Sequence, residues 1–468
     1  MEMKPNFVSS NPVKIMINIG ALMDIPTGSY ILGKHGESIL NGGLGFTTGV
    51  VGIGNNFKST ITHYMSLSAL SRIRESVETS LNTYDTEVNT HEWQLVKLTK
   101  RFPNLSKLDI FTDGVWQITD KTIYYANQWY DILREFLKGK KAGSDKHGVE
   151  TPFLNRDRTQ FVKIPVPTFT EVDSFSAFET EDVAKIQDTN QIGESGGNTI
   201  HMRQGLAKMR FLMELPALSG GAYNYTLLTA HVGKEIQMAS GPMPAPPTKK
   251  LQYLKNGDKL KGVTDQFFFL MTNCWHAYNA APFINQATKA PEYPRDCEDN
   301  MSGDTDLNIV TLRQLRSKSG PSGYALELLV SQSEGVLPEL SEFHYIKSND
   351  RFGISGTMQH YALDLYPDCK LQRTTIRSKI DSDPKLCRAL NITSELLQMK
   401  QFWHNVDDFM CTPKELYDDL KAKGYDWDVL LSTRGWWTLK NDKHSIPFLS
   451  TMDLLRMRKD LYKPYWLK

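Results

Sequence analysis

Cysteine is scarce and never clustered in this sequence. The cysteines lie far apart and no two of them form a C-x-x-C pair (Cys274, Cys297, Cys369, Cys387 and Cys411). A zinc ribbon needs closely spaced thiolates, and a small disulfide framework needs a higher density of cysteine, so the sequence argues against both classes. Free thiols are typical of a reducing compartment, and we expect a cytoplasmic protein, in a bacterial host if the source is viral.

An excess of one charge and long apolar runs are also missing. The chain has 54 Lys+Arg against 53 Asp+Glu, a formal net charge of +1. This balance excludes a globally basic nucleic-acid coat, although a local basic stripe remains compatible with it. The most apolar stretch, residues 267–271, is far too short to cross a bilayer, and residues 1–20 carry no apolar signal-sequence core. We therefore expect no membrane association.

The remaining composition is that of an ordinary globular protein, with 40% hydrophobic and 23% charged residues in 468. Strand and helix patterns alternate through the first half, a run of strands follows, and helical patterns dominate the end of the chain. We expect an α/β fold with a twisted, mostly parallel sheet flanked by helices, antiparallel strands at one edge, and a smaller, largely helical C-terminal unit. The expected divisions are an N-terminal segment at 1–35, a core at 36–348 and a C-terminal unit at 349–468.

Local patterns place the expected elements along the chain. Apolar runs predict strands at 48–51, 108–112, 164–173, 226–230, 267–272, 308–312, 324–331 and 340–346, with another ending at 84–87. Helical spacing or capping residues predict helices after 59, over 121–140 and 201–215, and within 383–431. Glycine, proline and lysine predict loops at 139–160, 182–200 and 239–262. The C-terminal tryptophans are expected in the core of the helical unit, with a DNA or partner surface as the alternative.

A glycine-bearing loop follows the first of these strands. Residues 52–59 read GIGNNFKS and come close to the phosphate-loop pattern G-x-x-x-x-G-K-[ST]. In such a loop, backbone N–H groups hold phosphate oxygens at a helix N-terminus, the lysine neutralises phosphate charge, and the hydroxyl ligates Mg²⁺. Phe57 departs from the pattern, which has glycine there, and a plain turn with an exposed lysine is the alternative. The residues expected to bind ATP are Gly52, Gly54, Asn55, Asn56, Phe57, Lys58, Ser59 and Thr60.

Two acidic residues follow later predicted strands. Asp173 ends the strand at 164–173, where a magnesium ligand opposite a phosphate loop is required, so we expect Ser59 and Asp173 to hold Mg²⁺. Glu87 ends the segment Tyr84-Asp-Thr-Glu. Ligands of open α/β sheets bind outside the carboxyl ends of strands, so Glu87 is placed to orient or deprotonate the attacking water. The alternative for both is a solvated acidic turn.

A basic stretch in the loop at 239–262 predicts contact with nucleic acid. Lysines there can release phosphate counterions, and the tyrosine among them can stack on a base. A solvated loop is the alternative, because most charge runs are solvated. The candidate DNA-binding residues are Lys249, Lys250, Tyr253, Lys255, Lys259 and Lys261.

The order of these motifs resembles the RecA recombinases. The phage UvsX branch is the most similar, because it also has the F-K-S variant of the phosphate loop. The motifs that carry the resemblance are the phosphate loop, YDTE, the strand ending in Asp-Ser, a glycine-bearing loop, HMRQGLAKMRFL and LLTAHVGKE. The resemblance covers roughly residues 36–348, and the specific signal is the order of the motifs.

The resemblance implies an ATP-dependent, single-stranded DNA-binding recombinase with a RecA-like P-loop ATPase core. It implies that 192–197 is the first DNA-binding loop and 233–262 the second. It makes His231 the residue that senses the γ-phosphate, and Arg316 and Lys318 basic groups that reach ATP across a subunit interface. It also implies a homo-oligomer, single-stranded and homologous duplex DNA as partners, and single-strand-binding and mediator proteins. Catalytic roles thus fall to Glu87, Lys58, His231, Arg316 and Lys318.

Two departures and two alternatives accompany the resemblance. No clear polymerisation helix appears in 1–35, although the segment could serve as an oligomerisation arm, and an insertion is expected near 90–160. A ring-forming replicative helicase of the DnaB class shares the fold and a stretch like 316–323. Tyr84-Asp-Thr-Glu87 and the lack of a collar domain favour the recombinase. A nucleic-acid scaffold with a degenerate ATP site is the other alternative, which Phe57 supports.

Overall fold

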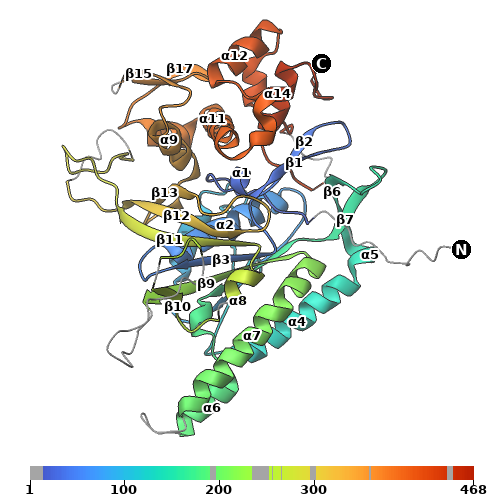
Figure 1. Ribbon diagram of the computed structural model, residues 1–468, viewed down its shortest axis with the longest axis vertical. Helices are drawn as coiled ribbons and strands as arrows, with labels where there is room; N and C mark the ends of the chain where they lie inside the picture. The colour runs from blue at the N-terminus through green and yellow to red at the C-terminus, as the bar shows by residue number, and fades with distance from the viewer. Residues whose placement is uncertain are drawn as a thin grey trace, which may run out of the picture.

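A large, mostly parallel sheet flanked by helices organises the chain, so the expected mixed α/β class is confirmed (Figure 1). The computed structural model describes residues 14–189, 197–234, 252–255, 257–264, 266–295, 302–357, 360–439 and 446–467. Within these ranges, no helix is both long and apolar enough to cross a bilayer.

The 10-stranded sheet has a parallel centre and an antiparallel edge. The order of its strands is β14-β13-β12-β11-β3-β9-β8-β4-β5, and β10 pairs with β9 outside this order. The parallel strands are β11 (Asn273–Pro282), β3 (Thr47–Gly52), β9 (Asn224–Lys234), β8 (Thr168–Asp173), β4 (Leu81–Asp85) and β5 (Trp116–Asp120). The antiparallel strands are β12 (Leu307–Ser317), β13 (Ala325–Ser331), β14 (Gly335–Val336) and β10 (Asp258–Leu260). The antiparallel strands at one edge agree with the sequence prediction.

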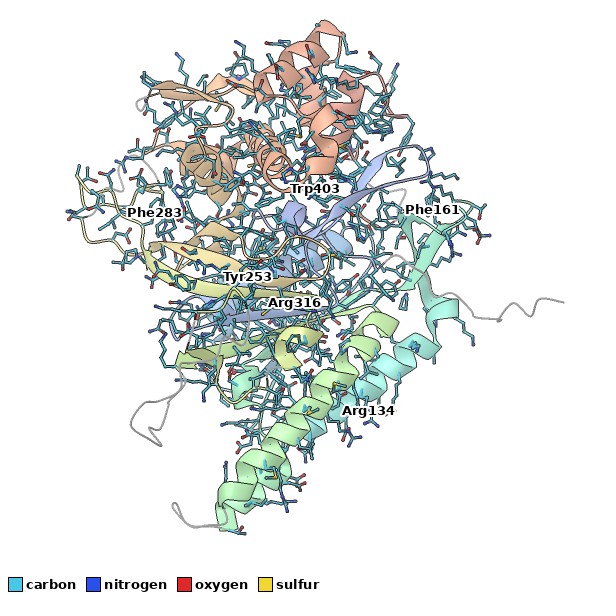
Figure 2. The ribbon with its side chains drawn as sticks, in the orientation of Figure 1. Arg134, Phe161, Tyr253, Phe283, Arg316 and Trp403 are labelled. Carbon is cyan, nitrogen blue, oxygen red and sulfur yellow. The ribbon has the colours of Figure 1, made fainter. Side chains whose placement is uncertain are left out.

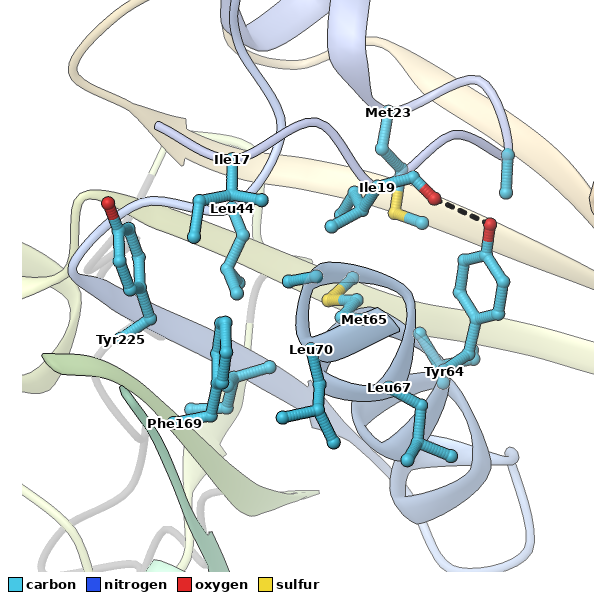
Figure 3. Close-up of a cluster of buried hydrophobic side chains, with 14 of the residues drawn as sticks. Ile17, Ile19, Met23, Leu44, Tyr64, Met65, Leu67, Leu70, Phe169 and Tyr225 are labelled. Atoms are coloured by element: carbon cyan, nitrogen blue, oxygen red, sulfur yellow. Dashed lines mark hydrogen bonds between the residues drawn. The ribbon is translucent and has the colours of Figure 1, made fainter. Parts of the chain in front are cut away.

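Helices cover both faces of this sheet. Helix α2 (Lys58–Arg74) packs on one face, and α4 (Ala126–Ala142), α7 (Gly197–Ala222) and α8 (Gln266–Leu270) pack on the other. Neighbouring strand residues divide between the two faces: Val50 belongs to the core around α2, while Val51 belongs to the core around α4 and α7. Because both faces are covered, successive residues of a central strand such as β3 are all buried. Figure 3 shows Leu70 and Phe169 in the core around α2.

The C-terminal part combines helices with a small antiparallel sheet. Its helices are α9 (Pro338–Ser348), α10 (Ile376–Ser382), α11 (Pro384–Phe402), η2 (His404–Phe409), α12 (Pro413–Ala422), α13 (Trp427–Leu431) and α14 (Thr451–Arg458). The strands β15 (Ile354–Thr357), β16 (His360–Leu363) and β17 (Tyr366–Leu371) were not predicted. Thr412 caps α12 as expected, accepting a hydrogen bond from the Glu415 amide at 3.2 Å.

The tryptophans of this part are mostly buried. Trp403 and Trp427 lie in the core of the C-terminal helices. Trp437 packs instead in the core around α2, where its ring meets Phe153 edge-on at 5.2 Å. The prediction of positions in the core of the helical unit therefore holds for Trp403 and Trp427, whereas Trp437 joins the C-terminal segment to the sheet.

The described part of the N-terminal segment is built into the same core. It forms α1 (Asp24–Thr27) and the hairpin β1 (Ser29–Leu32) with β2 (Ser38–Asn41). Gln398 Nε2 donates to Leu22 O at 2.7 Å, and Tyr64 Oη donates to Ile19 O at 2.6 Å (Figure 3). Residues from 14 onward thus hold α2 and α11 together within the chain, and a role of this segment in oligomers stays a prediction.

Three strand predictions are wrong. Residues 266–270 form α8, and 338–348 form α9, which Pro338 starts at its first turn. Residues 108–112 form turns although Ile110 is buried, and the next strand is β5. Aromatic and β-branched residues favour strands only weakly, and tertiary packing overrode that preference here.

Three loop predictions are also wrong in part. The stretch 139–160 contains the end of α4, α5 (Ser144–His147) and β6 (Gly148–Leu154), which pairs with β7 (Phe161–Pro165). The stretch 182–200 begins inside α6 (Glu181–Thr189), and 258–260 form β10. The structure also adds α3 (Glu92–Thr99) and η1 (Phe175–Ala177). Lysine-rich segments carry no apolar period from which these elements could be predicted.

Candidate functional site

Three of the five predicted catalytic residues, Lys58, Glu87 and His231, lie where the parallel strands end. Gly52 is in register with His231, and Asp85 is in register with Asp173. Because β3, β4, β8 and β9 run parallel, their carboxyl ends lie at one edge of the sheet. The structure therefore brings the loop at 53–57, Glu87, Asp173 and His231 to a common place, which we call the catalytic edge.

The loop between β3 and α2 has the backbone of a tight turn into a helix. Asn55 and Phe57 both adopt left-handed conformations, with φ of 59° and 57°. Such values favour glycine, and they cost a residue with a Cβ about 1–2 kcal/mol. Phe57 stands where the phosphate-loop pattern has glycine, and its half-buried ring packs against the core around α2. Phe57 thus adopts a backbone conformation that glycine, the residue of the pattern, also adopts readily.

The start of α2 presents amide groups and a lysine to the same space. No described residue accepts a hydrogen bond from the amides of Gly54, Asn55, Ser59 or Thr60. The Lys58 ammonium folds back over the loop and donates to Ile53 O at 2.7 Å. Burial lowers the pKa of Lys58, while the nearby carboxylates of Asp173 and Glu87 act in the opposite direction. Open amides beside a cation at a helix N-terminus form an anion-binding arrangement.

Asp173 and Ser174 connect the ends of β8, β9 and β4. Asp173 Oδ1 accepts a hydrogen bond from Thr229 Oγ1, which leaves its second carboxylate oxygen without a described partner. Ser174 N donates to Thr86 Oγ1 at 2.7 Å, and Thr86 N donates to Asp173 O at 2.8 Å. These bonds fix the carboxylate of Asp173 relative to the segment that carries Glu87.

Glu87 and His231 contact each other directly. The His231 Nε2 to Glu87 Oε1 distance is 3.0 Å, and Ser174 Oγ donates to the same oxygen at 3.1 Å. Partial burial raises the pKa of Glu87, but the hydrogen bonds from His231 and Ser174 outweigh it, so the net shift is downward. Glu87 is therefore ionised near neutral pH, as a base or water-orienting group must be.

The catalytic edge carries oxygen atoms that could coordinate a divalent cation together with phosphate oxygens of a bound nucleotide. Among the described residues, no group of three His, Cys, Asp or Glu side chains is arranged to hold a metal. Mg²⁺ keeps several waters and uses one or two protein oxygens with substrate phosphates, so a dense cluster is not needed. Ser59, in the first turn of α2, and Asp173 supply the hydroxyl and carboxylate expected there.

Arg316 and Lys318 lie toward the other end of the central strands. Arg316 pairs with Cys274, which pairs with Gly49, and the Lys318 amide donates to Thr272 O at 3.0 Å. These positions flank the beginning of β3, whereas the loop after Gly52 flanks its end. Within one chain, the structure does not bring Arg316 and Lys318 to Lys58.

The described part of the predicted DNA-binding loop returns to the catalytic edge. The Lys261 amide donates to His231 O at 2.8 Å, and β10 carries Lys259 opposite Gly233. Lys255 and Lys261 are exposed. Lys249, Lys250 and all but Gly197 of the first predicted loop, 192–197, lie outside the described residues.

Tyr253 takes a position that the sequence did not predict. Its ring lies so close to Gly323, in the loop that follows Arg316, that a Cβ at this glycine would collide with it. Figure 2 labels Tyr253 and Arg316. Gly323 has φ of +96°, and both its conformation and this close approach require glycine. The tyrosine is half-buried and connects the two predicted functional loops.

Sequence reasoning missed the residues that support this edge. Asp85 accepts hydrogen bonds from the amides of residues 87–90, and so shapes the turn that carries Glu87. The buried Lys208 ammonium donates to Ser176 O and Gly262 O at 2.7 and 2.8 Å. The YDTE segment contained a signal for Asp85, since an aspartate before a turn commonly accepts local amides. Nothing local marked Lys208.

Comparisons with protein-family models and with curated proteins found no match to this chain. What the site can do therefore has to be inferred from its own geometry.

Proposed function

We propose that this chain binds ATP with Mg²⁺ at the loop 52–60 and hydrolyses it to ADP and phosphate. The observation that carries the proposal is the meeting of Lys58 and the open amides of α2 with Asp173 and Glu87 at one edge of a parallel sheet. Phosphoryl transfer needs positioning and charge neutralisation more than covalent chemistry, and this set of groups supplies both.

Each residue has a role in this proposal. The amides at 54–60 and the Lys58 ammonium hold the phosphate oxygens, and the cation held by Ser59 and Asp173 neutralises charge between the phosphates. Glu87 orients the attacking water or accepts its proton, and His231, bonded to Glu87, senses whether the γ-phosphate is present. To receive a phosphate oxygen, Lys58 has to exchange its bond to Ile53 O for the ligand.

We further propose that the ATPase is coupled to single-stranded DNA, as in a RecA-type recombinase that pairs and exchanges strands. The support is the backbone bond from Lys261 to His231, which links the basic loop to the residue beside Glu87. The exposed Lys255 and Lys261 can neutralise a nucleic-acid backbone. The resemblance to the recombinases supports the same conclusion, with a homo-oligomer on DNA, and with single-strand-binding and mediator proteins as partners in a cytoplasm.

The ring helicase alternative shares the fold and a stretch like 316–323. The recombinase is favoured because Glu87 and His231 are in contact, which gives a direct route from the nucleotide to the basic loop. A scaffold with a degenerate ATP site is disfavoured because Phe57 keeps the left-handed backbone that glycine would adopt.

Steady-state ATP hydrolysis with and without single-stranded DNA tests the proposal. We expect DNA-stimulated turnover, its loss in Lys58→Ala, and a decrease of about 10²-fold or more in Glu87→Gln with ATP binding retained. Arg134→Gln, on the distant helix α4, is a matched control that should keep wild-type turnover. Wild-type turnover in Lys58→Ala would show that the loop is not the phosphate site. A turnover that single-stranded DNA does not change would contradict the recombinase proposal. Electron micrographs with ATP and DNA separate a filament from a ring.

A further inference from the structure

A large cavity lies between the C-terminal half of α2 and the C-terminal helices. It has a volume of about 910 Å³, within the range of small-molecule sites. Its walls come from α2, the starts of α9 and α11, and residues 431–436. Arg72 lines it 14 positions after Lys58, about 21 Å along α2 at 1.5 Å per residue. The cavity is therefore separate from the loop at 52–60.

Unpartnered buried donors converge on this cavity. Arg388 Nε, Trp436 Nε1 and Arg72 Nη1 are buried without a hydrogen-bond partner among the described residues, and all three side chains line it. Arg388 is only 5% exposed, and its other nitrogens bond to Asn391 and Leu449 O, so Nε alone is left over. Arg72 Nη1 forms an ion pair with Asp24 Oδ2 at 3.5 Å, a distance longer than that of a well-formed hydrogen bond. Buried donors without acceptors are rare in native proteins, and several in one cavity indicate a missing acceptor.

Five cationic and four acidic side chains line the cavity, and two of the cations pair with acids outside the lining, Lys385 with Asp428 at 2.7 Å and Arg72 with Asp24 at 3.5 Å. Asp383 is already bonded to amides at the start of α11, and Glu339 pairs with Arg101 at 3.6 Å. Burial raises the pKa of Glu342 well above its ordinary value, and its Oε2 has no hydrogen-bond partner among the described residues. Burial also raises the pKa of Glu75, against the opposing effects of Arg434, Arg72 and a hydrogen-bonding contact with the Trp436 side chain, so Glu75 is an acceptor close to Trp436 Nε1 although no well-formed hydrogen bond joins them. The lining cations are Arg72, Arg101, Lys385, Arg388 and Arg434, and the lining acids are Glu75, Glu339, Glu342 and Asp383.

The arrangement of these hydrogen-bond donors indicates the chemistry of the ligand. The Arg72 guanidinium stacks on the Trp436 ring at 4.5 Å, which fixes its fork of N–H groups in place. The Nη1 group of Arg72, the Nε group of Arg388 and an indole N–H are three donors that suit a ligand with several acceptor oxygens and negative charge. We propose that this cavity binds a small phosphate-bearing anion between the sheet and the C-terminal helices. The bound phosphate accepts from Arg72, Arg388 and Trp436.

The test uses the full chain with Lys58→Ala, so that the loop at 52–60 does not compete for phosphate. Inorganic pyrophosphate is titrated into this protein by isothermal calorimetry. We expect one site per chain, weakened about tenfold or more by adding Arg72→Gln or Arg388→Lys, as the loss of a hydrogen bond to a charged group predicts. Adding Arg134→Gln, a control on the opposite face of the sheet, should change the affinity less than about twofold (Figure 2).

Circular dichroism of the variants and titrations with other phosphate compounds complete the test. Arg388 also holds Leu449 O, so if Arg388→Lys unfolds by circular dichroism, Arg72→Gln and Trp436→Phe carry the test. Titration with orthophosphate and with AMP identifies the source, since tighter binding of AMP indicates a nucleotide and equal binding indicates free phosphate. No binding of pyrophosphate at millimolar concentration, or equal binding in Arg72→Gln and Trp436→Phe, overturns the proposal. Because Lys58 is already replaced, neither result depends on ATP hydrolysis.

Discussion

His63 and Glu171 form a buried pair beneath the catalytic edge, with His63 Nδ1 2.9 Å from Glu171 Oε2. His63 lies on α2, five positions after Lys58, and Glu171 lies on β8, two positions before Asp173. Glu171 is fully buried and also accepts from Ser66 and Thr83. The pair therefore joins the helix that carries the phosphate loop to the strand that carries the proposed metal ligand.

Replacing either partner should destabilise the fold by different amounts. His63→Gln leaves the Glu171 carboxylate buried without its cation, and we expect a loss of about 3–5 kcal/mol in the free energy of unfolding, as for other broken buried pairs. Glu171→Gln leaves a neutral imidazole, which is less costly to bury, so its loss should be smaller. Urea unfolding at pH 7 measures both, and equal losses would contradict a charged pair.

The same pair should make stability depend on pH in a defined window. Burial lowers the pKa of His63, but Glu171 outweighs this and the net shift is upward; the pKa of Glu171 is shifted downward because His63 and its hydrogen bonds outweigh burial. The His63 contribution is complete below its unfolded pKa of about 6.5 and is lost as pH rises through the raised folded value. The Glu171 contribution is complete above about 4.3 and is lost as pH falls.

The window is checked by comparing unfolding free energies of wild type and a His63→Leu, Glu171→Met double variant between about pH 5 and 9. Wild type should lose its advantage progressively on the alkaline side, while the double variant lacks that slope. A difference that stays constant across this range would mean that His63 is neutral in the folded protein.

The sequence predicted the parallel sheet and its catalytic edge because those signals are local. A buried strand, a turn and a capped helix are each encoded by adjacent residues. Because ligands of such sheets bind at the carboxyl ends of strands, these local signals also predict where the site lies. Lys58, Glu87 and Asp173 were placed this way, His231 was implied by the resemblance to the recombinases, and the structure brings the four together. The supporting pair His63–Glu171 was missed because its members are 108 positions apart.

The wrong predictions share a physical cause. In 266–270, Phe267 and Phe268 are both buried while Phe269 is 47% exposed, a pattern that a short helix on a sheet face allows and a regular strand does not. In α9, nearly every side chain from Leu340 to Ile346 is buried, so no polar face revealed its period. Burial on all sides removes the periodic signal on which sequence prediction depends.

Phe57 should tolerate glycine and reject β-branched residues. Its φ of 57° is left-handed, which glycine adopts freely and valine almost never does. We expect Phe57→Gly to retain ATP affinity within about threefold, since about 1 kcal/mol of altered packing is offset by relief of strain. Phe57→Val should lose about tenfold or more in affinity, measured with a fluorescent ATP analogue. Equal affinities in the two variants would mean that this backbone conformation does not matter for binding.

Neutralising the basic loop should weaken DNA binding and flatten its salt dependence. The variant replaces Lys249, Lys250, Lys255, Lys259 and Lys261 by alanine. Each phosphate that is no longer neutralised should reduce the slope of log K against log salt by about 0.7 for single-stranded DNA. Fluorescence anisotropy with an oligonucleotide over a salt series measures the slope. A variant of lysines on α4 (Lys138 and Lys141) is the control, and an unaltered slope in the loop variant places the DNA path elsewhere.

Arg316 and Lys318 should act on the ATP of a neighbouring subunit. Their place near the beginning of β3 keeps them from the loop after Gly52 in their own chain, so any contact with nucleotide there has to come from a second copy. A basic group supplied in trans stabilises charge on the γ-phosphate and contributes on the order of 10³ or more in rate. Arg316→Ala and Lys318→Ala should therefore bind ATP nearly normally as isolated subunits and lose DNA-stimulated turnover.

Mixing variants separates action in trans from action in cis. In a mixture of Arg316→Ala with Glu87→Gln, one kind of interface pairs an intact Glu87 with an intact Arg316 from its neighbour. That interface should restore part of the turnover, although each variant alone is inactive. Because every subunit in the mixture carries one defect, no chain can recover activity by itself. Co-assembly is confirmed by fluorescence energy transfer between labelled subunits, and a mixture that co-assembles without any gain in hydrolysis would assign Arg316 and Lys318 to their own chain.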